Sequence, residues 1–135
     1  MPVHPDVAGS PAPLDRGDRQ REATAWAALP MALAFAAGVW LLLAPTVLSY
    51  ADAGVDAASW NDRIVGPALA VLAVVQIVTP VAVTALGLAV AILGAWLVVA
   101  PFLLGYDGAP RAVVNDVLVG AGVVVLAALA AVRRR

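Results

Sequence analysis

The chain has 135 residues, of which 63% are hydrophobic and 13% are charged, and its formal net charge is −1. Soluble domains are roughly 45–50% apolar and about 25% charged, so a mean hydropathy of +0.94 excludes an ordinary water-soluble fold. The small net charge excludes a general attraction to nucleic acid. Cysteine is absent, which excludes disulfides, thiol nucleophiles and iron–sulfur clusters. All eight basic residues are arginine, which indicates a GC-rich bacterial coding bias.

The N-terminal segment, residues 1–22, carries four prolines, small residues and mixed charge, and it has little apolar surface to bury. We therefore predict a disordered tail. The stretch from Asp15 to Glu22 alternates in charge and leaves open an extension of the first helix towards the membrane interface.

Four apolar segments follow the tail, and the first two are separated by a polar loop. The first predicted span, about 26–48, is roughly 34 Å long as a helix and exceeds the roughly 30 Å hydrocarbon core of a bilayer. The second predicted span is 60–78. Ser59 precedes Trp60, Asn61 and Asp62, an order typical of a helix N-cap followed by an acid in the first turn.

A charge-free run from Ile64 to Leu104 is too long for a single crossing. Thr79-Pro80 is the breaker near its middle, because proline lacks the amide hydrogen that would continue the preceding helix. The third predicted span is therefore 81–104. Residues 107–110 read as a turn with Pro110 as the first helical residue, and the fourth predicted span is 110–132.

The second half of the chain repeats the first. GVWLLLAPTVLSY and WNDRIVG return as GAWLVVAPFLLGY and VNDVLVG, with an offset of 56 residues in the first block and 54 in the second. We interpret this as an internal duplication of a two-helix hairpin. Hairpin repeat 1 covers 23–79 and hairpin repeat 2 covers 81–135. The residues that define the repeated motif are Gly38, Trp40, Pro45, Asn61, Asp62, Gly66, Gly94, Trp96, Pro101, Asn115, Asp116 and Gly120.

The predicted fold is all-α, a four-helix transmembrane bundle built from two parallel two-helix repeats. The repeats are parallel because each contains an even number of spans, which places the pseudo-twofold axis along the membrane normal.

Arginine distribution predicts the orientation. Arg16, Arg19, Arg21 and 133–135 lie on the side of both termini, whereas the opposite side holds two arginines, so both termini should be cytoplasmic in a plasma membrane. The side chains that we place in the aromatic belts at the two membrane boundaries are Trp26, Tyr50, Trp60 and Tyr106.

The two prolines of the repeated W-L-x-x-A-P segment, Pro45 and Pro101, fall in the odd-numbered spans. They either open a cavity between the repeats or bend the helices so that small residues such as Gly38 and Gly94 pack closely. We favour close packing, because the sequence places no charge at that depth.

The Asn-Asp pairs at 61–62 and 115–116 fall in the first turns that we predict for the even-numbered spans. Two equivalent carboxylates are suited to bind a cation or protons, but an acid at a helix N-terminus is also favoured by the helix dipole. We favour helix capping at the membrane interface. Between the interfaces we expect Gln76 as the single strongly polar side chain, and no catalytic, cofactor-binding or metal-binding residues.

The duplicated WLLLAP and WLVVAP segments, with WNDRIVG and VNDVLVG downstream, resemble the SPW repeat family of small prokaryotic integral membrane proteins. The resemblance covers most of 38–132 and implies the hairpin fold without an established activity. The Ser-Pro-Trp motif that names the family reads Ala44-Pro45-Thr46 and Ala100-Pro101-Phe102 here.

Together these patterns predict a non-enzymatic membrane protein of structural or accessory type. The alternative is a small-solute or ion pathway at the repeat interface. The bilayer itself is the expected partner, with a second membrane protein or a second copy of the chain left open, and no nucleic acid or cofactor is expected.

Overall fold

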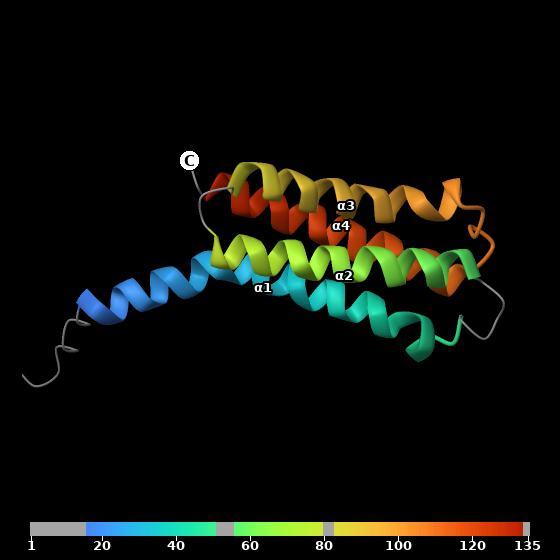
Figure 1. Cartoon of the computed structure of the whole chain (residues 1–135), viewed down its shortest axis with the longest axis horizontal. Coiled ribbons are helices and arrows are strands. Elements are labelled where there is room, and N and C mark those ends of the chain that lie inside the picture. The colour runs from blue at the N-terminus through green and yellow to red at the C-terminus, as the bar shows by residue number, and fades with distance from the viewer. Residues whose placement is uncertain (1–15, 51–55, 80–82, 134–135) are drawn as a thin grey trace, which may run out of the picture.

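The computed structural model describes residues 16–50, 56–79 and 83–133, which form four helices, α1 (Arg16–Val47), α2 (Asp56–Val78), α3 (Val83–Leu103) and α4 (Pro110–Val132). The helices run alternately up and down and lie side by side (Figure 1). α1 packs mainly on α2 and α3 mainly on α4, while α1–α4 and α2–α3 contacts join the two hairpins. This is the all-α four-helix bundle of two parallel hairpins that the sequence predicts.

All four helices are long and apolar enough to cross a membrane. Large side chains such as Leu43, Val71, Leu88 and Leu118 are exposed around the outside, each by 50% or more. In water such a surface would aggregate, but in a bilayer it is the lipid-facing surface. The chain is therefore a multi-pass integral membrane protein.

α1 corrects the prediction of a disordered tail over residues 1–22, because it begins at Arg16 and projects beyond the bundle (Figure 1). Asp18 and Arg21, and likewise Arg19 and Glu22, are three residues apart, a spacing that favours a helix for opposite charges. Residues 16–22 are therefore helical, which is the extension of the first helix that the charge pattern left open. Residues 1–15 lie outside the described residues.

The other helix bounds differ less from the sequence-based spans. α2 begins at Asp56, four residues before the predicted 60, because Asp56 supplies the acid of the first turn and alanines follow it. Ser59 is consequently inside the helix and buried, so the prediction that it is the N-cap is wrong. α4 begins at Pro110, as its sequence predicts. α2 ends at Val78 and α3 begins at Val83, and Pro80 between them lies outside the described residues.

Each hairpin is held by a close crossing of two glycines. A Cβ atom built on Gly38 would lie 2.6 Å from the Gly66 carbonyl oxygen, and one built on Gly120 would lie 2.5 Å from the Gly94 carbonyl oxygen. Membrane helices lack a hydrophobic driving force between them, and small residues let their backbones approach and gain packing contacts. Equivalent glycines therefore position α2 on α1 and α4 on α3.

The chain turns after α1 and after α3 at equivalent residues. Ser49 has a φ of 58° and Gly105 a φ of 74°, and Tyr50 and Tyr106 follow them. We call this end of the bundle the tyrosine end and the opposite one the terminal end. At the terminal end Arg133 Nη1 donates to the Trp26 carbonyl oxygen at 2.9 Å, which ties the end of α4 to α1.

Candidate functional site: a buried polar network between the repeats

The Asn-Asp pairs lie inside the bundle rather than at its surface. Asn61 and Asp62 are the sixth and seventh residues of α2, and Asn115 and Asp116 hold the same positions in α4. At 1.5 Å per residue these positions lie about 9 Å from the helix start. Both aspartates are 0% exposed.

This depth corrects the capping interpretation. Only the first four amides of a helix lack an intrahelical acceptor, so side chains at the sixth and seventh positions cannot serve as N-caps. α4 indeed has no side-chain hydrogen bond at its N-cap residue, Ala109. The carboxyl groups are buried in membrane-spanning helices, where their hydrogen bonds go to other side chains.

A tyrosine hydroxyl serves each aspartate within the same repeat. Tyr50 donates to Asp62 Oδ2, and Tyr106 donates to Asp116 Oδ2 at 2.6 Å. Both tyrosines are buried, with 3% and 4% of their surface exposed, so they face the inside of the bundle and not the surrounding interface as belt residues would. Their depth at the membrane boundary stays a prediction. Trp26 and Trp60 are the exposed aromatic residues of that prediction.

Burial raises the pKa of the Tyr50 hydroxyl above its ordinary value, and the hydrogen bond to Asp62 and the negative charges of Asp62 and Asp116 raise it further. The pKa of Tyr106 is raised first by burial, then by its bond to Asp116 and the two aspartate charges. Both phenols therefore keep their protons at neutral pH and act as donors. Because each aspartate acts on both tyrosines, the two copies form one electrostatic cluster.

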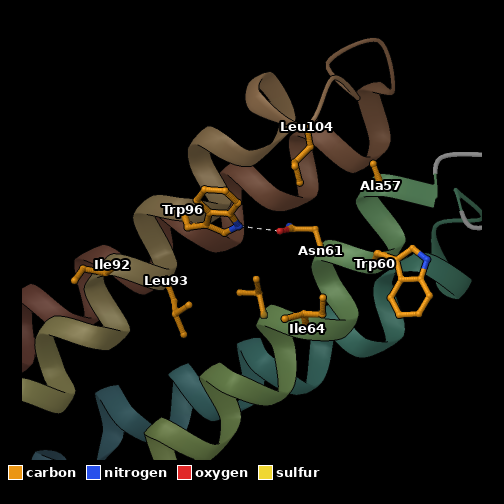
Figure 2. Close-up of a pocket in the computed structure, with 9 residues that line it drawn as sticks. Ala57, Trp60, Asn61, Ile64, Ile92, Leu93, Trp96 and Leu104 are labelled. Atoms are coloured by element: carbon orange, nitrogen blue, oxygen red, sulfur yellow. Dashed lines mark hydrogen bonds between the residues drawn. The ribbon is translucent and has the colours of Figure 1, made fainter.

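The tryptophans of the repeated motif bond across the repeat interface. Trp40 Nε1 on α1 donates to Asn115 Oδ1 on α4 at 2.8 Å, and Trp96 Nε1 on α3 donates to Asn61 Oδ1 on α2 at 2.9 Å. Figure 2 shows Trp96 and Asn61 pointing towards one another between their helices. Each hairpin thus supplies the donor for one bond and the acceptor for the other.

The asparagine amides complete the network in two different ways. Asn61 Nδ2 donates to the Tyr106 hydroxyl of the other repeat at 3.3 Å, whereas Asn115 Nδ2 donates to Asp116 Oδ1 of its own repeat at 3.1 Å. Asp116 Oδ1 consequently has a donor, while Asp62 Oδ1 is buried without one among the described residues. The two carboxyl groups are close enough to interact electrostatically.

The remaining motif residues shape the space around the network. Pro45 and Pro101 are buried in the last turns of α1 and α3, and Ala44 and Ala100 beside them pack in one cluster with the two tyrosines. The four glycines form the two helix crossings. The structure thus brings the tryptophan, asparagine and aspartate residues of the motif into one site and places its glycines and prolines around that site.

The chain matches the SPW repeat domain over residues 25–130, which is most of its length. The chain belongs to the SPW repeat family. Neither the comparison with curated proteins nor the comparison with solved structures gives a match. The family assignment therefore supports the membrane fold, and any activity has to be argued from the site itself.

The variant motif of this SPW repeat protein has a structural explanation. Thr46 and Phe102, which stand at the third position of the Ser-Pro-Trp motif, are exposed on the outside of the bundle. Ala44 and Ala100, at its first position, are fully buried and make apolar contacts. The network of this SPW repeat protein uses neither position.

Tyr50 and Tyr106 are the site residues that the sequence-based list omits. Their signal is present in the sequence, because the repeat retains tyrosine at both places, whereas exposed Trp60 is replaced by Val114 in the second copy. Within the described residues, no three His, Cys, Asp or Glu side chains gather as metal ligands would. That the protein binds no metal or cofactor stays a prediction.

Proposed function

We propose that this SPW repeat protein is a non-enzymatic structural or accessory component of its membrane. The observation that carries the proposal is the reciprocal bonding of Trp40 to Asn115 and Trp96 to Asn61, which uses the polar groups of the motif to hold the hairpins together. The exterior, lined with exposed Leu, Val and Ile side chains, is suited to packing against another membrane protein or a second copy.

The proposed location is the bacterial plasma membrane with both termini in the cytoplasm. Figure 1 shows the charged start of α1 and the end of α4 at the same end of the bundle. Arg16, Arg19, Arg21 and Arg133 therefore share one side, in line with the positive-inside rule. A periplasm-active reporter enzyme fused after Arg135 should be inactive, and activity there would reverse the orientation.

Isolation of the chain with its neighbours tests the accessory role. The tagged protein would be expressed at native level, extracted directly into lipid nanodiscs and analysed by mass spectrometry. We expect a reproducible, stoichiometric membrane protein or a second copy of the chain. A monomer purified alone would contradict the proposal.

A second candidate function, an ion pathway at the repeat interface, draws on one specific observation. Asp62 and Asp116 are buried near one another, and Asp62 Oδ1 has no donor among the described residues. Two buried carboxylates repel each other unless a proton or cation lies with them. Proteoliposomes loaded with a pH-sensitive dye test this function: a pathway gives a proton or cation flux that Asp62→Asn and Asp116→Asn abolish, whereas the accessory role gives no flux in the unmodified protein.

A further inference from the structure

A groove runs along the outside of the bundle between α1 and α4, starting at the tyrosine end. Its volume is about 560 Å³, within the range of roughly 300–1,000 Å³ of small-molecule sites. The Trp40–Asn115 bond lies in its wall, and the rest of the lining is apolar except at the mouth. The lining residues are Trp40, Leu48, Pro110, Arg111, Val114, Asn115, Leu118 and Val119.

Arg111 supplies the only charge among these lining residues. Its guanidinium is exposed, and its Nη1 donates to the Leu48 carbonyl oxygen at a long 3.5 Å. This bond spans the groove mouth from α4 to the residue after α1, which leaves most of the guanidinium donors directed elsewhere. The arginine is the second residue of α4, where the helix dipole disfavours a positive charge. Its position therefore does not serve helix stability.

The equivalent groove between α2 and α3 provides an internal comparison. It has a volume of about 650 Å³ and contains the Trp96–Asn61 bond, but Ala57 stands where Arg111 stands in the other groove (Figure 2). Leu104 of this groove corresponds to Leu48, and Ile64 corresponds to Leu118. Both grooves are lined mainly by apolar side chains, although Trp60, Ile92 and Leu93 line only the α2–α3 groove. Only the α1–α4 groove has a charged side chain in its lining.

We propose that the α1–α4 groove binds one glycerophospholipid with an anionic headgroup. An acyl chain lies along the apolar wall, and the phosphate meets the Arg111 guanidinium, whose planar donors match phosphate oxygens. Lipid is the occupant that the charge complementarity selects, since the groove faces the bilayer and an arginine next to a membrane attracts anionic headgroups. This site is independent of the proposed accessory function, because it requires only the membrane-embedded fold.

The test counts lipids that stay with the full chain. The protein would be placed in nanodiscs of nine parts phosphatidylcholine and one part phosphatidylglycerol, released, and analysed by native mass spectrometry. We expect one retained phosphatidylglycerol on the unmodified chain. Arg111→Ala should reduce its retention by about fivefold, the effect of one arginine near an anionic surface. Ala57→Arg, which copies the charge to the second groove, should add a second retained phosphatidylglycerol.

Arg63→Ala is the matched control, because it removes the same charge near the same end of the bundle but does not line either groove. It should leave the retained lipid unchanged, and all three variants should keep the helical circular dichroism of the parent. Equal retention in the Arg111→Ala variant, or an equal loss in Arg63→Ala, would overturn the proposal. A third outcome would also overturn it. If Arg111→Ala released a co-purifying protein and left the number of retained lipids unchanged, the groove would hold a protein partner and not a lipid.

Discussion

Hairpin α1–α2 and hairpin α3–α4 carry tryptophan, tyrosine, asparagine and aspartate at equivalent places, but their turns and exposed residues differ. Ser49 in the first turn corresponds to Gly105 in the second, and exposed Trp60 corresponds to Val114. At the groove mouths, Ala57 corresponds to Arg111. A side chain held by the network has to match its hydrogen-bond partner, and the equivalent residues are the same in both hairpins. Positions outside the network, such as Trp60 and Val114, are free of that requirement, and the two hairpins differ there.

The largest expected effect tests whether the two glycine crossings are equivalent. Gly66→Ala and Gly120→Ala each place a Cβ atom against a backbone carbonyl oxygen, at 2.8 Å and 2.5 Å. Backbone has to move to relieve such contacts, so each variant should lower the free energy of unfolding by about 1–3 kcal/mol. Unfolding by sodium dodecyl sulfate in mixed micelles, followed by circular dichroism, measures this change.

Gly122→Ala is the matched control for the glycine variants, because no atom lies within 4 Å of a Cβ built at this α4 residue. It should unfold like the parent or slightly later, since alanine favours helix more than glycine. If Gly66→Ala were as harmless as this control while Gly120→Ala were not, the two crossings would not be equivalent.

A smaller effect should follow from removing one bond of the network. Trp40→Phe and Trp96→Phe keep an aromatic ring but lose the indole donor, so each should reduce the free energy of unfolding by about 0.6–2 kcal/mol. In a double-mutant cycle, Trp40→Phe should couple more strongly to Asn115→Leu, its direct partner, than to Asn61→Leu, which it reaches only through the rest of the network. Stronger coupling of Trp40 to Asn61 instead would show that the bonds do not cross between the repeats.

The two turns offer a reciprocal exchange of residues. A left-handed backbone conformation costs a non-glycine residue about 1–2 kcal/mol. Glycine avoids this cost, but it loses more conformational entropy on folding, which offsets part of the gain. Ser49→Gly should therefore stabilise the protein by about 0.5 kcal/mol, and Gly105→Ser should destabilise it by a similar or larger amount. The same unfolding assay compares the two variants, and a loss of stability in Ser49→Gly would show that its hydroxyl matters more than its backbone.

The smallest effect at neutral pH concerns tyrosine ionisation. Since the pKa values of Tyr50 and Tyr106 are raised in the folded state, the folded protein holds these protons more tightly than the unfolded chain does. The contribution of the two tyrosines to the free energy of unfolding is fully present below the ordinary tyrosine pKa of about 10, and it is lost as pH rises above that value. Absorbance at the phenolate band should show no tyrosine ionisation up to that pH in nanodiscs. Ionisation of either tyrosine at or below it would contradict their burial beside the aspartates.

The sequence predicts the helices and their pairing well, because apolar segment length and the repeat offset are direct consequences of the bilayer and of the two-hairpin plan. The sequence predicts the first residues of the helices less well. Opposite charges at helical spacing continue α1 back to Arg16, although composition alone favoured disorder for residues 16–22. α2 likewise starts before Ser59, because Asp56 can already occupy the first turn.

The buried network could be predicted only in part. The repeat identified Trp40, Trp96 and the Asn-Asp pairs, but an aspartate near a helix start is equally consistent with a cap, and the sequence does not show how far inside the helix it lies. Which tryptophan meets which asparagine depends on how two distant hairpins pack. Composition alone favours an interfacial, outward-facing place for Tyr50 and Tyr106, because tyrosine is enriched at membrane boundaries, and only the structure shows that their rings are buried in the bundle.

The crossed Trp–Asn bonds make each hairpin half of a closed unit. A single hairpin in lipid would hold one indole donor and one amide acceptor without partners, and a second identical hairpin would satisfy both, as at the self-complementary interface of a twofold dimer. Joining the halves through the residues between Val78 and Val83 converts that association into an intramolecular step with a high effective concentration. The short connection therefore makes assembly of the unit independent of how dilute the protein is in its membrane.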